Sequence, residues 1–273
     1  MRKISIFFLF LLFALMACKP GDESANHKAM HDDSLETVKR SGFLRWGADV
    51  IGGEPYVFED QKNPGTYIGC EVDIAAGIAK QLGVKPKLVI TPWDNLIPSL
   101  QDGDFDTAMN AIEATEDRSK IVLFSEPYYV YAQQITVRKE TQGINTLEDL
   151  KGKKVATLSG TAAEDLLRKI PDIQVQINPE IIYSYRDLES GKVDAVVLDT
   201  PIAAAFGATN PKLKNTGEPF AEGIYIIAFR QNQISLRDAI NDILQHMKEN
   251  GELKAIYEKW NIMNSQQKKI GIR

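Results

Sequence analysis

The chain has 273 residues, with 32 lysines and arginines against 37 aspartates and glutamates, and its formal net charge is −5. This length allows one large domain or two lobes that each bury a core. The acidic balance and the scatter of the basic residues do not fit a nucleic-acid-binding surface, so no nucleic-acid partner is expected.

The first eighteen residues have the pattern of an export signal. A short basic head is followed by an apolar run from Ile6 to Ala17, which is too short to cross a bilayer stably. The run ends in Leu-Met-Ala-Cys and resembles the lipobox of bacterial lipoproteins. The resemblance implies a signal peptide over residues 1–17, cleavage before Cys18, and acyl chains such as palmitate on that cysteine. The alternative is an uncleaved signal anchor in which the cysteine is incidental.

Residues 18–34 are polar and lack hydrophobic periodicity, which is typical of a tether. We therefore expect an exported protein that lipid holds at the membrane, in a periplasm or on the outer face of the cell. If Cys18 carries lipid, the other cysteine, Cys70, has no partner for an intramolecular disulfide. We expect Cys70 to be a small core residue rather than a reactive thiol.

Short apolar runs and helical hydrophobic stripes alternate from about Ser34 to Asn261. One such stripe, from Val72 to Leu82, stops at Gly83, which is typical of a helix C-cap. Repeated alternation of strands and helices predicts an α/β fold with largely parallel sheets. The expected strands cover residues 44–48, 87–90, 105–109, 154–158, 173–177 and 193–198, and the expected helices cover residues 72–82, 95–101, 162–169, 185–189, 236–250 and 253–260.

Residues 100–109 and 188–197 resemble each other, since each joins a helix end, a glycine and an apolar strand that leads into a polar loop. In open α/β sheets, ligands bind outside the carboxyl ends of strands. Two such units predict two facing lobes with the binding site between them.

Seven segments carry a resemblance to a known family, in the right order along the mature chain. They are GADVIGGEPYVFED, YIGCEVDIAAGIAKQLG, WDNLIPSLQDGDFD, ATEDRSKIVLFSEPYYV, LEDLKGKKVATLSGTAAEDLL, SGKVDAVVLD and GELKAIYEKW. From Leu44 to Trp260 the chain resembles the amino-acid-binding family of periplasmic solute-binding proteins (family 3) of ABC transporters. The resemblance implies the type II periplasmic-binding-protein fold, an α/β fold of two lobes joined by a two-strand hinge, each lobe a mixed, largely parallel sheet flanked by helices.

The same resemblance implies the division of the chain. The first lobe would comprise residues 35–134 plus 224–264, and the second lobe the inserted stretch 135–223. The two hinge crossings are expected near residues 135–138 and 222–225, and residues 265–273 are expected to be a polar tail.

The function that the resemblance implies is capture of an amino acid, with a polar or cationic one favoured, between two closing lobes. The protein would act as a monomer, without metal or other cofactor, and deliver its ligand to the membrane permease of an ABC importer. Two alternatives use the same fold. One is a dehydratase of the cyclohexadienyl type that acts on prephenate or arogenate, with Glu113 as the candidate general acid. The other is a stand-alone sensory receptor.

A ligand carboxylate is best held by the two parallel hydrogen bonds of an arginine. Arg118 matches the family's carboxylate-binding arginine, and Gly160, Thr161 and Ala162 match the loop that caps the carboxylate from the second lobe. Ala162 stands where the family often has a hydroxyl, so the resemblance carries over only its backbone N–H.

A ligand ammonium needs acceptors. Asp199 ends an apolar strand and matches the family's ammonium-binding aspartate, although the Thr-Pro that follows also fits a helix N-cap, and the two roles are compatible. Asn110 and Ala111 match positions whose polar or backbone atoms meet the ammonium.

The ligand side chain is expected between aromatic walls. Trp93 and Tyr56 align with positions that pack on it, although Tyr56 fits a core role equally well, and Asp49 is expected near the side-chain tip. Gly53, two residues before Pro55, stands where many relatives have another aromatic.

Glu113 stands where relatives usually have Thr or Ser. An uncompensated carboxylate is costly in a cleft that closes, so Glu113 must face a cation, either Arg118 or a positive group of the ligand. In the first case a plain carboxylate ligand binds less well, and in the second case the pocket favours a cationic ligand.

Overall fold

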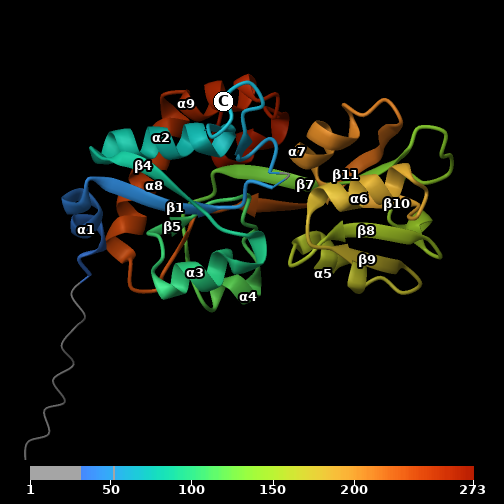
Figure 1. Cartoon of the computed structure of the whole chain (residues 1–273), viewed down its shortest axis with the longest axis horizontal. Helices are drawn as coiled ribbons and strands as arrows, with labels where there is room; N and C mark the ends of the chain where they lie inside the picture. Colours follow the sequence, from blue (N-terminus) through green and yellow to red (C-terminus); the bar gives the residue numbers. More distant parts are fainter. Residues whose placement is uncertain (1–31, 52) are drawn as a thin grey trace, which may run out of the picture. The chain divides into compact units, whose positions relative to one another are not determined.

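A computed structural model describes residues 32–51 and 53–273 of the chain (Figure 1). The expected signal peptide, Cys18 and the expected tether up to residue 31 lie outside the described residues. Within residues 32–51 and 53–273, no helix combines the length and the apolar character needed to cross a membrane.

Two five-stranded sheets organise these residues, and the first has the strand order β4-β1-β5-β12-β6. Its strands are β1 (Phe43–Ala48), β4 (Lys85–Ile90), β5 (Thr107–Ala108), β6 (Leu123–Phe124) and β12 (Ala228–Phe229). Its helices are α1 (Ser34–Ser41), α2 (Cys70–Leu82), α3 (Leu96–Asp102), α4 (Glu116–Ser119), α8 (Ile234–Glu249) and α9 (Glu252–Lys259), with a single turn, η1 (Trp93–Asn95), before α3. A hairpin of β2 (Phe58–Glu59) and β3 (Tyr67–Ile68) extends from it. We call this part the first lobe.

The second sheet has the order β11-β7-β10-β8-β9 and forms the second lobe (Figure 1). Its strands are β7 (Tyr129–Arg138), β8 (Lys154–Leu158), β9 (Gln174–Asn178), β10 (Ala195–Asp199) and β11 (Leu213–Tyr225). Its helical segments are η2 (Glu148–Leu150), α5 (Ala162–Arg168), α6 (Ile181–Glu189), α7 (Thr200–Ile202) and the π-helical turn η3 (Ala203–Gly207).

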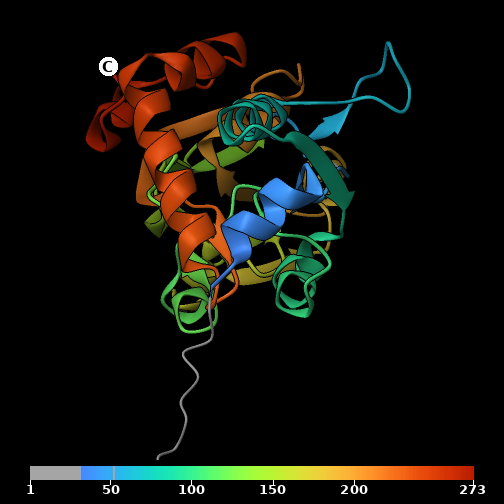
Figure 2. The same cartoon turned by 90° about the vertical axis from the view of Figure 1, so that its left-hand side faces the viewer.

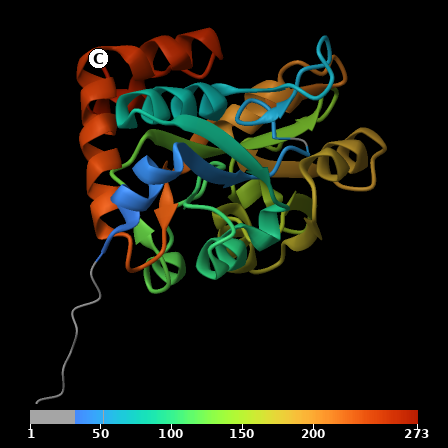
Figure 3. The same ribbon diagram turned by 60° about the vertical axis from the view of Figure 1, so that its left-hand side comes forward.

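The predicted alternation of strands and helices is confirmed. The strand over 154–158 is β8, and the stripe from Val72 to Leu82 lies in α2, whose end at Gly83 has the left-handed φ of +75° that favours glycine. Cys70 begins α2 as a buried free thiol, as predicted. Helix α1 was not among the predicted helices. It packs beside α8, and Figures 2 and 3 both show the two helices next to each other.

Both sheets are mixed. Four strand pairs are parallel (β1–β4, β1–β5, β8–β9 and β8–β10), and four are antiparallel (β5–β12, β6–β12, β7–β10 and β7–β11). The antiparallel pairs all involve β7 or β12, the strands that follow the places where the chain changes sheets. The expected hinge crossings do not lie side by side: residues 135–138 of β7 pair with residues 213–216 of β11, whereas residues 223–225 of β11 pair with residues 129–131 of β7.

The two similar sequence units have equivalent places in the two lobes. Gly103 and Gly191 both have left-handed φ values, +84° and +75°. After each glycine comes an aspartate whose carboxylate accepts the backbone N–H of a neighbouring parallel strand: Asp106 from Arg45 of β1, and Asp194 from the first residue of β8. The sequence similarity therefore reflects a repeated helix-to-strand unit, as the sequence predicts.

The expected polar tail is instead a packed element, η4 (Ser265–Ile270), in which Gln267 is fully buried. Strand β10 pairs with β7 only from Gln133 onward, so the preceding residues of β7 have a backbone edge that β10 does not cover. The Gln267 amide fills this place: its Nε2 donates to the Val130 carbonyl at 2.8 Å, and its Oε1 accepts from the Val130 N–H at 2.9 Å. One side-chain amide thus replaces a missing strand residue.

Replacing Gln267 with alanine should therefore leave both backbone groups of Val130 without a partner in a buried place. We expect Gln267→Ala to lower the free energy of unfolding by about 1–3 kcal/mol. Chemical denaturation measures the change, with Lys268→Ala at the exposed neighbouring position as the control. Equal stabilities of the two variants would contradict this role of the tail.

Candidate functional site

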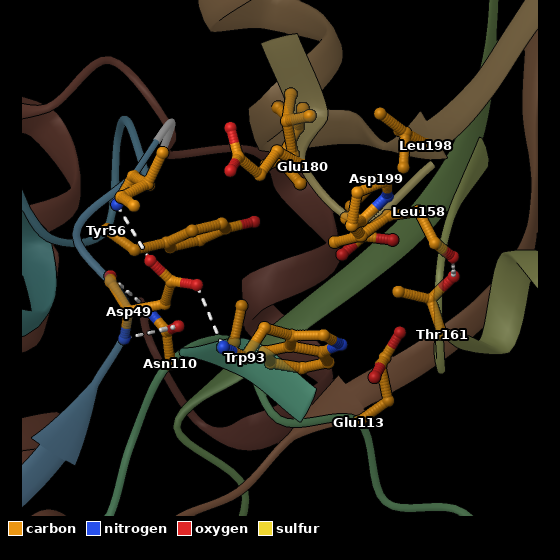
Figure 4. A pocket seen from close by; sticks show the side chains of 16 residues that line it. Asp49, Tyr56, Trp93, Asn110, Glu113, Leu158, Thr161, Glu180, Leu198 and Asp199 are labelled. Carbon is orange, nitrogen blue, oxygen red and sulfur yellow. Dashed lines mark hydrogen bonds between the residues drawn. The ribbon is translucent and has the colours of Figure 1, made fainter. Parts of the chain in front are cut away.

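A pocket opens between the carboxyl ends of strands from both lobes (Figure 4). The empty space between its lining atoms, including the part open to solvent, is about 550 Å³. The predicted site residues that line it are Asp49, Tyr56, Trp93, Asn110, Ala111, Glu113, Thr161 and Asp199. Arg118 and Gly160 line the adjoining cavity beside Trp93, and the backbone of Ala162 contacts Glu113. All the predicted ligand-binding residues are thus brought to one place, although their roles toward a ligand stay predictions.

Asp199 ends β10 at the pocket wall and is only 6% exposed. It stands at the N-cap position of α7, yet its side chain makes no capping hydrogen bond. Its carboxylate instead accepts hydrogen bonds from Gln133 Nε2, at 2.9 Å, and from the Tyr225 hydroxyl. Burial raises the pKa of Asp199 to about 7, and the carboxylate of Glu113 adds to the increase. A positive charge placed beside this carboxylate would lower its pKa again.

Asp49 and Asn110 form the floor of the pocket on the first lobe (Figure 4). The Asp49 carboxylate accepts the backbone N–H groups of Ile51 and Trp93, both at 2.8 Å. Asn110 Oδ1 accepts the N–H of Asp49 at 3.1 Å. These bonds fix the Asp49 carboxylate at the end of β1, where it keeps lone pairs for a further donor.

Ala111 has a φ of +53°, a conformation that residues other than glycine rarely adopt. The carboxylate of the fully buried Glu71 holds it by accepting the Ala111 N–H at 2.7 Å. This N–H is therefore used within the protein, and only the carbonyl of Ala111 remains to meet a ligand ammonium. Burial raises the pKa of Glu71 to about 7.

Tyr56 and Trp93 form aromatic walls. Tyr56 is 4% exposed, packs edge-on against Tyr225 and shares a hydrogen bond with its hydroxyl at 2.8 Å, so it is both a core residue and a pocket residue. The Trp93 indole N–H donates to the carbonyl of Ser159 in the second lobe at 2.9 Å. Its ring also lies 5.4 Å from the Arg118 guanidinium carbon, which is within the range of a cation–π contact.

Glu113 pairs with Arg118, which is the first of the two arrangements expected for it. The distance from Arg118 Nη1 to Glu113 Oε2 is 2.6 Å, and the Glu113 side chain is 2% exposed. The other oxygen, Oε1, accepts the N–H of Ala162 at 3.0 Å. A carboxylate of the protein itself thus lies between the arginine of the first lobe and the loop of the second.

The loop before α5 is also engaged within the protein. The Gly160 carbonyl accepts from Arg118 Nη2 at 2.8 Å, and its N–H donates to Glu164. The Thr161 hydroxyl donates to the Leu158 carbonyl and caps α5 by accepting the N–H of Glu164.

Sequence reasoning missed Glu180, Gln133 and Tyr225. Glu180 lines the pocket just after β9, and the rule that ligands bind beyond the carboxyl ends of strands identifies that position. Gln133 and Tyr225 lie within β7 and β11, where they read as ordinary strand residues. No local pattern marks them as the partners of Asp199.

The family follows from comparison with known proteins. Residues 48–263 match the family described as bacterial extracellular solute-binding proteins, family 3. The chain belongs to this family. It is 35% identical over 237 residues to the L-cystine-binding protein TcyJ of Escherichia coli (strain K12), which covers 85% of this chain and 88% of that protein.

Solved structures of this family share the two-lobed fold. An ancestral arginine-binding protein bound to arginine superimposes with a TM-score of 0.75 at 38% identity, over 80% of this chain and 98% of that chain. The ancestral amino acid-binding protein AncCDT-1, described as a precursor of cyclohexadienyl dehydratase, gives a TM-score of 0.77 at 33% identity, over 83% of this chain and 98% of that chain.

Two buried carboxyl groups with a raised pKa, Asp199 and Glu71, predict how the unliganded protein responds to pH. Asp199 and Glu71 have a higher pKa in the folded protein than in the unfolded chain, so the folded state binds more protons between their ordinary range and about pH 7. The free energy of unfolding should therefore decrease as the pH rises from about 5 to about 7. Groups such as Asp32, whose pKa is lowered to about 2, have the opposite effect only at lower pH.

Denaturation measured at several pH values tests this expectation. Asp199→Asn should reduce the loss of stability between pH 5 and 7, because the neutral amide has no charge to bury. The control Asp165→Asn removes an exposed acid of the same lobe and should keep the wild-type pH dependence. A wild-type stability that rises over this interval would show that neither acid is protonated in the fold.

Proposed function

We propose that this protein captures a small solute of the amino-acid type, with a cationic one favoured, and delivers it to the permease of an ABC importer. The observation that carries the proposal is the charge of the pocket. Four acids line it, Asp49, Glu113, Glu180 and Asp199, and none of its lining residues in the described chain is lysine, arginine or histidine. A concave site of one charge attracts ligands of the opposite charge.

The proposed roles follow the positions of the side chains. Asp199 would accept a ligand ammonium, with the carbonyl of Ala111 and the amide of Asn110 as further acceptors. Tyr56 and Trp93 would pack on the aliphatic part of the ligand. Asp49 and Glu180 enter the pocket from different lobes, and each could hold a second positive group at the far end of the ligand (Figure 4).

Binding without chemical conversion fits the relatives, which are named as binding proteins for L-cystine, arginine and glutamine. We therefore propose a binding protein rather than an enzyme. Thermal shifts against a panel of arginine, lysine, ornithine, glutamine, cystine and glutamate test the proposal. A ligand at a hundred times its dissociation constant should stabilise the protein by about 2.7 kcal/mol. A preference for glutamate or for a purely apolar amino acid would contradict a cation-selective site.

Asp199 provides the sharpest test of the ammonium contact. Asp199→Asn keeps the size of the side chain and removes its charge. We expect it to weaken the binding of the tightest-binding cation of the panel by roughly 2–5 kcal/mol. Calorimetry measures the affinity, with Asp165→Asn again as the control. If the Asp199→Asn variant binds this ligand with an affinity within about threefold of the wild type, Asp199 does not contact the ligand ammonium.

We further propose that the protein is exported and anchored by lipid at Cys18. The support is the apolar run that ends in Leu-Met-Ala-Cys, together with the extracellular character of the family. A monomer tethered in this way would reach the permease while it remains at the membrane.

Cys18→Ser should release the protein from membranes or block its maturation, because acyl chains supply the free energy of anchoring. Membrane fractionation and the intact mass of the detergent-extracted protein measure the effect. The matched control is Cys70→Ser, which changes the buried thiol and should leave anchoring unaffected. A mature wild-type chain that begins at another residue and carries no lipid would refute the assignment.

A further inference from the structure

The guanidinium of Arg118 and the backbone N–H of Ala162 already bind a carboxylate of the protein itself, that of Glu113. Glu113 accepts from Arg118 Nη1 at 2.6 Å with one oxygen and from the Ala162 N–H at 3.0 Å with the other. Arg118 Nη1 also donates to the Glu113 carbonyl at 2.8 Å, so the guanidinium binds both the backbone and the side chain of this residue. The backbone of Glu113 is further held by a bridge to Tyr225.

Three of the five guanidinium N–H groups of Arg118 are already used within the protein. Its Nη2 donates to the Gly160 carbonyl at 2.8 Å, and the Trp93 ring lies near its guanidinium. The ion pair with Glu113 cancels its charge locally, and both side chains are shielded, at 15% and 2% exposure. Toward the pocket, the pair therefore presents little net positive charge.

The rest of the pocket repels anions. Beyond Glu113, its acids are Asp49, Asp199 and Glu180, and no basic side chain lines it in the part of the chain that the structure describes. A ligand carboxylate that enters would face these acids without a free cation to compensate it. A ligand ammonium or guanidinium would be attracted by the same groups and by the faces of Tyr56 and Trp93.

We propose that Glu113 is a specificity-determining residue that replaces the carboxylate of the ligand, so that the site selects amines and guanidines without a free carboxylate. This inference rests on the proposed function, because it assumes that this pocket is where the ligand binds. The preferred ligand is related to a cationic amino acid whose carboxylate is absent or masked as an amide.

A ligand with a free carboxylate must compete with Glu113 for Arg118. Glu113 would then lose its pairing with Arg118 while it remains buried and charged, next to a second carboxylate. Breaking a buried pair in this way is strongly unfavourable, because one charge is left uncompensated. Ligands without the carboxylate leave the pair intact and avoid this cost.

Pairs of ligands with and without a carboxylate separate the effect of ligand charge on affinity from the effect of ligand shape. Calorimetry on the full mature chain compares arginine with argininamide and agmatine, and lysine with cadaverine. Argininamide has nearly the shape of arginine but lacks its negative charge. We expect argininamide and agmatine to bind at least about tenfold more tightly than arginine, and cadaverine more tightly than lysine.

Two variants locate the cause. Glu113→Gln removes the internal negative charge and leaves the charge of Arg118 uncompensated. The ratio of the affinities for argininamide and arginine should therefore shift toward arginine by about tenfold or more. The control Glu180→Gln also removes one pocket acid but leaves the Glu113–Arg118 pair in place. This control should weaken the binding of arginine and of argininamide to the same extent, so the ratio of their affinities should stay that of the wild type. Circular dichroism and thermal unfolding verify that each variant is folded.

The outcomes distinguish this inference from the proposed function. If wild type binds arginine as tightly as argininamide or more tightly, the pocket still captures a cationic amino acid, and the role of Glu113 is wrong. A folded Glu113→Gln variant with an unchanged ratio also overturns it. If none of the five compounds binds the folded wild type, the proposed function fails, and the inference fails with it.

Discussion

The antiparallel pairing of β7 with β11 is the constraint on which the rest of the structure depends. The two strands pair from Arg138 and Leu213 at one end to Tyr129 and Tyr225 at the other. Nine of the ten residues of β7 are buried. The strands belong to the second sheet, and their Tyr129–Tyr225 end packs against residues of the first lobe, where Tyr129 contacts Tyr257 of α9. Strand β11 is partly or fully exposed between its two buried ends, so the buried strand β7 is the member of the pair that can hold the two halves of a site in register.

The pocket depends on this pair for its central acid. Asp199 lies opposite Gln133 in the β10–β7 register, and Tyr225 reaches it from the end of β11. Tyr225 also stacks on Tyr131 and bonds to Tyr56, so the Asp199 carboxylate belongs to a chain of aromatic hydroxyl contacts that begins in the first lobe. Burying an acid in such surroundings costs stability in the unliganded protein. The same burial strengthens any contact with a cation, because the local dielectric is low.

Local sequence patterns predicted the parts of the fold that local chemistry determines. Glycine at a helix end, as at Gly83, and β-branched runs such as the one in β10 depend on their own residues and near neighbours. The short strands β6 and β12 have only two residues each and carry no pattern of their own. Gln267 read as part of a polar tail because its partner, Val130, is 137 residues away in the sequence.

The same distinction applies to the site. The family resemblance identified the loop at Gly160 and the acid at Asp199, and the structure brings both to the pocket. The sequence also indicated that Glu113 needs a cation, since burying a lone charge is costly. It left open which cation, because Arg118 and a ligand are chemically equivalent partners. Only the distances between atoms show whether the Glu113 carboxylate is paired within the protein or is free to bind a cationic ligand.

Trp93 makes the intrinsic fluorescence of the protein sensitive to the distance between the lobes. The chain has three tryptophans, and Trp93 is the one whose indole N–H is bonded to the opposite lobe. Trp46 is buried at 2% exposure within the first lobe, and Trp260 donates to Asp73 of the same lobe. Any separation of the lobes must break the bond from Trp93 to Ser159 and admit water to the indole, while the other two rings keep their surroundings. The change in intrinsic fluorescence when this cleft opens should therefore come from Trp93, against the constant emission of the other two tryptophans, and needs no attached dye.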